Sequence, residues 1–114
     1  MNVEEISLKN VPSRRACERV SLSLPVTLIA SNLGSAIISH GRTFDLSECG
    51  IGIATDVALQ PGQPVSLEFS VPLRSQLIKV RAMVKHHSDN FYGLQFDQAT
   101  EQQLRQIRKI TAGF

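Results

Sequence analysis

The run Val65-Ser66-Leu67-Glu68-Phe69-Ser70-Val71 decides the fold class of this chain of 114 residues. Apolar and polar side chains alternate along it, which is typical of a β-strand with one buried face. Five more segments are interpreted as strands: residues 22–28, 36–46, 51–55, 78–85 and 91–96. Pro25 lacks the N–H that a strand ladder uses and favours an edge or a bulge, and the second segment is expected to be interrupted near His40 and Gly41.

The last part of the chain changes its period. Thr100 and Gln103 have the spacing of a capping box, and Leu104, Ile107 and Ile110 recur on one face of a helix that Gly113 ends. Gly- and Pro-containing turns separate the strands before it. Several short antiparallel strands followed by one helix predict an all-β fold, a small barrel or sandwich with a helical cover.

Size and composition predict one soluble domain. The chain is 42% hydrophobic and 19% charged, with a formal net charge of +2, so any attraction for phosphate must be local. No apolar run is long enough to span a bilayer, and the acidic start lacks the features of a signal peptide. We therefore expect a cytoplasmic protein without membrane insertion, in which the two cysteines are free thiols. Residues 1–12 are interpreted as a flexible N-terminal arm.

Two short runs carry the chemistry. The first, called the arginine segment here, is Arg14-Arg15-Ala16-Cys17-Glu18-Arg19, and the second is Asp45-Leu46-Ser47-Glu48-Cys49-Gly50. A guanidinium group can donate two parallel hydrogen bonds to a phosphate or to a guanine edge. A carboxylate can accept from the N1 and N2 donors of guanine, a hydroxyl can bond a phosphate or the local turn, and glycine lets the backbone approach closely and tolerates positive φ.

These runs resemble the RxxxR and [D/N]xSxxG elements of PilZ domains, in the family's order and spacing. Gly41-Arg42-Thr43-Phe44, residues 59–63 and Tyr92-Gly93-Leu94-Gln95-Phe96 are also similar to that family. The resemblance implies a six-stranded antiparallel β-barrel with a C-terminal α-helix over residues 13–114. It also implies a cyclic di-GMP receptor rather than an enzyme. The implied ligand-binding residues are Arg14, Arg15, Arg19, Asp45, Ser47 and Gly50.

The resemblance carries further expectations about ligand and partner. In the family, a basic residue at the position of Arg14 accompanies two mutually intercalated ligand molecules, so a ligand dimer is favoured, with no other cofactor. Residues 10–19 are expected to be mobile without ligand and to close over the barrel with it. A single domain has no output domain, so the signal must pass to a downstream protein, for example of motility, pilus or exopolysaccharide machinery.

Other interpretations remain open. The chain could be a PilZ-like interaction module without ligand, although the motif residues are present. It could also be a nucleic-acid-binding barrel, but aromatic residues make up only 5% of the chain and most phenylalanines occupy expected core positions. His86 or Arg81 could reach the ligand. A zinc site from His40, His86, His87 and the cysteines lacks the usual spacing, and a redox switch between Cys17 and Cys49 is the less favoured alternative to free thiols.

Overall fold

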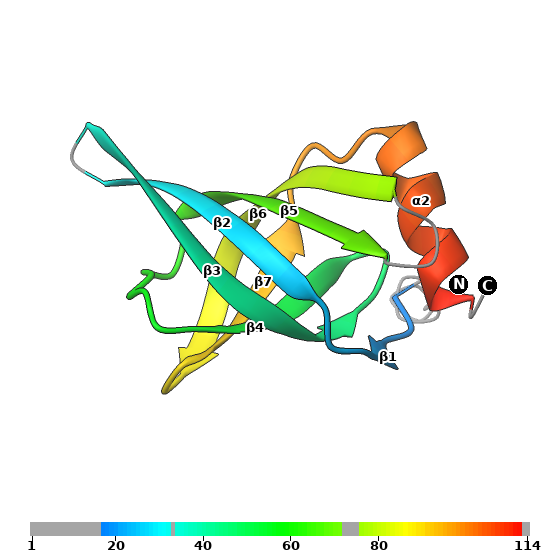
Figure 1. Ribbon diagram of the computed structural model, residues 1–114, viewed down its shortest axis with the longest axis horizontal. Coiled ribbons are helices and arrows are strands. Elements are labelled where there is room, and N and C mark those ends of the chain that lie inside the picture. Colours follow the sequence, from blue (N-terminus) through cyan, green and yellow to red (C-terminus); the bar gives the residue numbers. More distant parts are fainter. Residues whose placement is uncertain (1–16, 33, 72–75, 113–114) are drawn as a thin grey trace, which may run out of the picture.

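The structure is a computed structural model, and it describes residues 17–32, 34–71 and 76–112. The expected N-terminal arm, residues 1–12, lies outside the described residues. Seven antiparallel strands and one helix follow one another along the chain (Figure 1). The strands are β1 (Val20–Ser21), β2 (Pro25–Asn32), β3 (Ser35–Leu46), β4 (Gly50–Thr55), β5 (Pro64–Val71), β6 (Gln76–Ser88) and β7 (Phe91–Phe96).

Six of these strands close into a barrel. Their order is β3-β2-β5-β6-β7-β4, and the pairing of β4 with β3 completes the ring. The two-residue strand β1 adds to β3 outside this ring, with Val20 opposite Leu46 and Ser21 opposite Asp45. The predicted six-stranded antiparallel barrel is therefore confirmed, and β1 is an addition that the sequence pattern did not indicate.

The interior is filled by the apolar residues that alternate along the strands. In β5 the side chains of Val65, Leu67, Phe69 and Val71 are all buried, while the residues between them are not. Burying each such side chain contributes about 1.5–3 kcal/mol. Gly52 of β4 and Gly93 of β7 face each other in the sheet and carry no side chain.

Two local expectations about the strands are corrected or refined. The strand β3 is not interrupted at His40 and Gly41, because glycine there lets the Ala54 carbonyl oxygen of β4 approach where a Cβ would collide. The irregularity lies later, in a register shift between Thr43 and Asp45. Pro25 is the first residue of β2, a position that tolerates a missing N–H donor.

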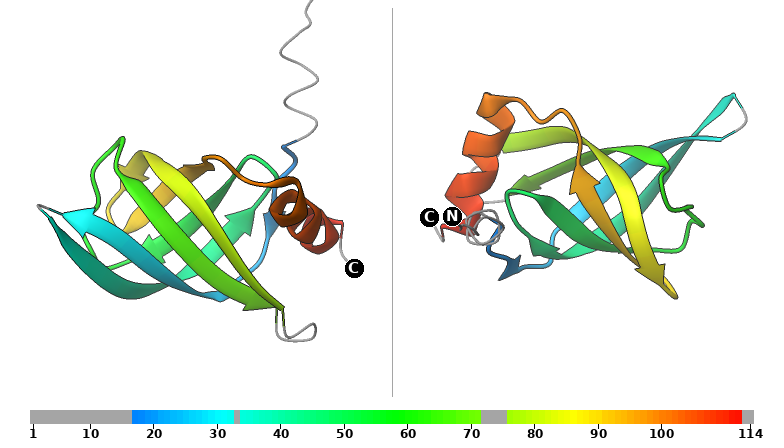
Figure 2. Two further views of the ribbon diagram at one scale, coloured as in Figure 1. Left: turned by 90° about the horizontal axis from the view of Figure 1, so that it is seen from above. Right: turned by 180° about the vertical axis from the view of Figure 1, so that it is seen from behind.

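The helix α2 (Glu101–Thr111) covers one end of the barrel, beside the described start of the chain (Figures 1 and 2). The predicted capping box is present, since Thr100 accepts from the Gln103 N–H and the Gln103 side chain accepts from the Thr100 N–H. Ile107 and Ile110 are buried against the barrel. The C-cap is Ala112, and the predicted helix stop at Gly113 lies outside the described residues. In the part of the chain that the structure describes, no helix has the length and apolar character needed to cross a membrane.

Candidate ligand-binding site

The strand β1 brings the two sequence motifs together. Its pairing with the end of β3 places Arg19, the residue just before β1, beside Asp45. The Arg19 Nη1 donates to the Asp45 Oδ1 at 3.0 Å. The arginine side chain is 53% exposed and the carboxylate 22% exposed, so the pair lies at the surface and a ligand can reach both groups.

A tight turn over residues 47–50, called the serine turn here, follows Asp45. The Ser47 side chain is fully buried, and its Oγ accepts from the backbone N–H groups of Cys49 and Gly50, each at 3.1 Å. The Ser47 N–H donates to the Gly50 carbonyl at 2.9 Å. The hydroxyl of Ser47 is therefore part of the turn that orients the second motif.

Three glycines next to this turn allow close contacts that a side chain would prevent. A Cβ at Gly50 would collide with the Leu94 carbonyl oxygen, so close approach of β7 rather than positive φ explains this glycine. At Gly52 a Cβ would meet the Phe44 ring and the Asp45 carboxylate, and at Gly93 it would collide with the His86 ring. Gly52 and Gly93 are opposite each other in the sheet, and their lack of side chains lets the Phe44 ring and the His86 ring lie close against the strands β4 and β7.

A hollow of about 260 Å³ opens beside the motif residues. It is lined by Arg19, Cys49, Gly50, Lys85, His86, Gly93, Leu94 and Gln95. Arg19 and Lys85 give it two positive charges, which favours an anionic ligand. His86, one of the two residues suggested as reaching the ligand, lines this hollow, whereas Arg81 is not among the lining residues. Lys85 was missed, and its only sequence signal is its position on the outward face of an alternating strand.

A second hollow shows that size alone does not identify the site. It measures about 550 Å³ and is lined by Ala30, Ser31, Ile37 and residues 57–63. None of the motif residues borders it. Its lining carries no charged side chain, so it lacks the groups that recognise a phosphate.

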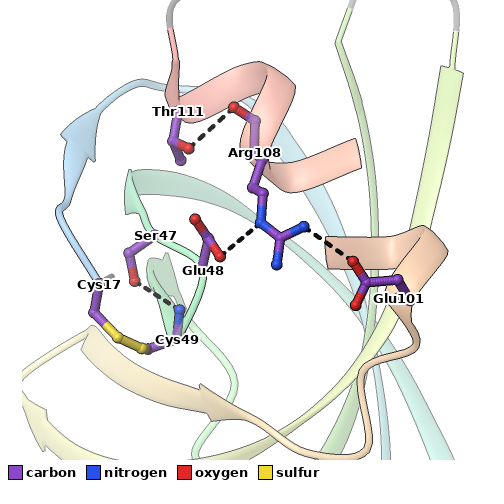
Figure 3. A network of polar contacts seen from close by, with 7 residues as sticks. All are labelled: Cys17, Ser47, Glu48, Cys49, Glu101, Arg108 and Thr111. Carbon is purple, nitrogen blue, oxygen red and sulfur yellow. Dashed lines mark hydrogen bonds and ion pairs between the residues drawn. A yellow bond between two sulfur atoms is a disulfide. The ribbon is translucent and has the colours of Figure 1, made fainter. Parts of the chain in front are cut away.

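The cysteines are paired, which corrects the expectation of free thiols. Cys17 of the arginine segment and Cys49 of the serine turn form a disulfide with their Cα atoms 5.3 Å apart (Figure 3). Their pairing depends on the contact between β1 and β3, which brings together residues 32 positions apart in the sequence. The bond joins the two motifs covalently.

A charged network joins the serine turn to the helix α2. The Arg108 Nε donates to the Glu48 Oε1 at 2.9 Å, and its Nη1 donates to the Glu101 Oε2 at 3.1 Å (Figure 3). The hydrogen bond that Arg108 donates to Glu48, and after it the one that it donates to Glu101, raise the pKa of Arg108 above its ordinary value. The sequence analysis did not find this network, because Glu48 and Arg108 are separated by 60 positions.

The remaining candidate residues are placed as follows. Arg19, Asp45, Ser47 and Gly50 lie together, whereas Arg14 and Arg15 are outside the described residues. Among the residues that the structure describes, no three His, Cys, Asp or Glu side chains are grouped as metal ligands.

Two of the four described phenylalanines depart from the core positions that were expected for most of them. Phe44 and Phe91 are 41% and 51% exposed and contact each other edge to face, with ring centroids 5.5 Å apart. Phe69 is buried and Phe96 half-buried, while Phe114 lies outside the described residues. The exposed ring pair therefore lies beside Asp45, with the Phe44 ring over Gly52.

Known structures share this architecture. The PilZ domain of CeSA from a cellulose-synthesizing bacterium matches with a TM-score of 0.67 and 20% identity, covering 84% of this chain and 96% of that one. The PilZ domain of YcgR from Escherichia coli, solved with c-di-GMP, matches with a TM-score of 0.65 and 19% identity, covering 85% and 88%. The Bacillus subtilis inhibitor of motility MotI/DgrA matches with a TM-score of 0.64 and 16% identity, covering 89% and 54%.

The sequence comparisons complete this result. No curated protein sequence matches the chain. The sequence model of the PilZ domain matches residues 13–113, almost the whole chain. The chain therefore belongs to the PilZ domain family.

Proposed function

We propose that this protein is a cyclic di-GMP receptor that changes conformation on binding and signals to a partner protein. The observation that carries the proposal is the contact between Arg19 and Asp45, which joins the two PilZ motifs into one charged surface. The PilZ domain of YcgR was solved with this ligand, and its fold is shared by this chain. The proposed binding residues are Arg14, Arg15, Arg19, Asp45, Ser47 and Gly50.

Each of these residues has a distinct task in the proposal. Asp45 accepts hydrogen bonds from the N1 and N2 donors of a guanine, and the arginines donate to phosphate oxygens or to the guanine O6 and N7. Arg19 exchanges part of its contact with Asp45 for a contact with the ligand. Ser47 acts through the turn, because its hydroxyl is buried and bonded there.

The energetics are sufficient for micromolar binding. A charge-assisted hydrogen bond contributes about 1.5–3 kcal/mol, and micromolar affinity requires about 8 kcal/mol. Four or five such contacts meet this requirement after ordering costs are subtracted. The proposed stoichiometry is two ligand molecules per domain, because Arg14 offers an additional guanidinium group next to Arg15.

The proposed output is a change at the surface of α2. Glu48 lies inside the second motif and accepts from Arg108 of the helix, so movement of the serine turn reaches α2 through one ion pair. A partner protein that docks on this helix would sense the occupied site. The protein acts as an adaptor in this proposal and catalyses no reaction.

Isothermal titration calorimetry with cyclic di-GMP tests the proposal. The wild-type protein should bind in the micromolar range, with a fitted stoichiometry near two ligands. Arg15→Ala and Asp45→Asn should each weaken binding at least tenfold. Arg105→Ala is the matched control, because this arginine is exposed on α2 and does not line the hollow. No heat and no shift in melting temperature with the wild type would refute the proposed function.

A further inference from the structure

The disulfide occupies a particular place in the candidate site. Cys17 lies in the middle of the arginine segment, and Cys49 lies in the serine turn, so one covalent bond spans the two motifs. Cys17 is half-buried and Cys49 is exposed. A small thiol in solvent can therefore reach the bond, and accessible disulfides are the ones that exchange readily.

The Cys49 end of this bond is fixed to the barrel. The Cys49 N–H donates to the Ser47 Oγ at 3.1 Å, and the Cys49 carbonyl accepts from the Phe96 N–H at 2.9 Å. The next residue, Gly50, begins β4. Breaking the disulfide would leave these contacts in place, so the serine turn does not depend on it.

The Cys17 side of the disulfide has fewer contacts with the barrel than the Cys49 side. Among residues 17–19, Cys17 is joined to the barrel by the disulfide and Arg19 by its hydrogen bond to Asp45, and β1 begins at the next residue, Val20. That hydrogen bond joins exposed groups, and such pairs contribute little by themselves. The disulfide at Cys17 and the strand pairing that begins at Val20 therefore hold residues 17–19 at both ends, and without the disulfide one of these two restraints is lost.

We propose that the thiol–disulfide state of Cys17 and Cys49 controls the affinity of this site for its anionic nucleotide, with the disulfide form binding more tightly. The proposal rests on the proposed function, because it concerns regulation of the same site. With the bond intact, residues 17–19 of the arginine segment are already held beside the serine turn. In the dithiol form the ligand must order this segment as it binds, which weakens the affinity.

The chemistry requires only a low-molecular-weight thiol and its disulfide, for example glutathione. A glutathione thiolate attacks one protein sulfur, the protein S–S bond breaks, and one cysteine leaves as a thiolate that takes up a proton. A second glutathione thiolate attacks the mixed disulfide and releases the other cysteine. One protein disulfide and two glutathione molecules thus become two protein thiols and one oxidised glutathione, and the reverse exchange restores the bond.

The expected effect is about a tenfold loss of affinity on reduction. Fixing the backbone of a single residue is enough to account for a change of this size, and the bond constrains several residues. The oxidised form is expected to bind more tightly because, with the disulfide present, Arg19 already lies at hydrogen-bond distance from Asp45. If the disulfide held the segment away from Asp45, reduction would instead raise the affinity.

Calorimetry on one protein in two redox states tests this inference. Wild-type protein is oxidised with glutathione disulfide or reduced with a phosphine, its thiols are counted by alkylation and mass spectrometry, and each form is titrated with cyclic di-GMP. The oxidised form should bind about tenfold more tightly. The double variant Cys17→Ser/Cys49→Ser should bind like the reduced form and should not respond to the phosphine.

Hydrogen exchange separates local release from loss of the fold. In the reduced protein without ligand, amides of residues 17–19 should exchange faster while those of β4 keep their protection. Equal affinities in the two states, tighter binding by the reduced form, or loss of protection throughout β4 would overturn the inference. Binding in neither state would refute the proposed function itself, whereas equal binding in both would refute only the redox control.

Discussion

The serine turn and the arginine segment form one candidate site but are held in different ways. The serine turn has a fully buried hydroxyl that accepts two backbone N–H groups, and β4 and β7 continue from it. The described part of the arginine segment, residues 17–19, is held by a disulfide, by one ion pair at the surface and by its continuation into the two-residue strand β1. The serine turn is thus part of the barrel structure, whereas the described part of the arginine segment is attached to the barrel by a few contacts.

This difference predicts which property each substitution changes. Disturbing the serine turn should lower the stability of the whole domain, and ligand affinity would fall with it. Disturbing the arginine segment should leave the barrel folded and change affinity alone. The following predictions are ordered from the largest expected effect on stability to the smallest.

Gly50→Val should have the largest effect. A side chain at this position would collide with the Leu94 carbonyl oxygen, and the neighbouring strand cannot move without breaking its ladder. Overpacking of this kind costs about 1–3 kcal/mol and more where backbone must shift. Urea unfolding followed by circular dichroism measures the change. Gly34→Val is the comparison for a glycine with open space, where only its positive φ is strained. A Gly50→Val protein as stable as the wild type would contradict the observed close approach.

Ser47→Ala should lower the free energy of unfolding by about 2 kcal/mol. It leaves the buried Gly50 N–H and the part-buried Cys49 N–H without their acceptor, and an unsatisfied buried group costs about 1–3 kcal/mol. The same unfolding measurement applies, with Ser66→Ala on β5 as the control. If Ser47→Ala and Ser66→Ala change the free energy of unfolding equally, the buried hydroxyl of Ser47 would not stabilise the serine turn as described.

Arg19→Ala should separate stability from binding. The side chain is 53% exposed, so loss of its ion pair should change the free energy of unfolding by less than about 1 kcal/mol. Affinity for cyclic di-GMP should nevertheless fall about tenfold, since one charge-assisted contact is removed. Unfolding and calorimetry on the same sample measure both quantities. A large loss of stability would show that the arginine segment belongs to the barrel as firmly as the turn does.

Arg108→Ala should have the smallest effect on stability, because its ion pairs with Glu48 and Glu101 are exposed. The melting temperature should be nearly unchanged, and ligand affinity should be retained. Hydrogen exchange should show that binding no longer alters the protection of α2. If ligand binding still changed the protection of α2 in this variant, the ion pair between Arg108 and Glu48 would not link the site to the helix.

The sequence predicted most of the fold and part of the site, for identifiable physical reasons. Alternation along β5 and the capping box at Thr100 are local patterns, so they could be recognised without knowing the tertiary structure. The pairing of Cys17 with Cys49 and of Glu48 with Arg108 depends on contacts between distant segments, and composition favoured free thiols. Phe44 is exposed because the register shift after Thr43 and the missing side chain of Gly52 place its ring on the outer surface. These features follow from strand register, which a local pattern does not specify.

The central claim is that the two motifs form one cyclic di-GMP site. The most direct test is an NMR titration that follows the amide chemical shifts of the protein as cyclic di-GMP is added. In ¹⁵N-labelled wild-type protein, cyclic di-GMP should shift the amides of Arg19, Gly50 and Gly93 together, with one common dissociation constant. The amide of Gly62, which borders the larger hollow, should not move. Shifts confined to residues 57–63, or no shifts at a ligand concentration of several hundred micromolar (about 100 times a micromolar dissociation constant), would contradict the account.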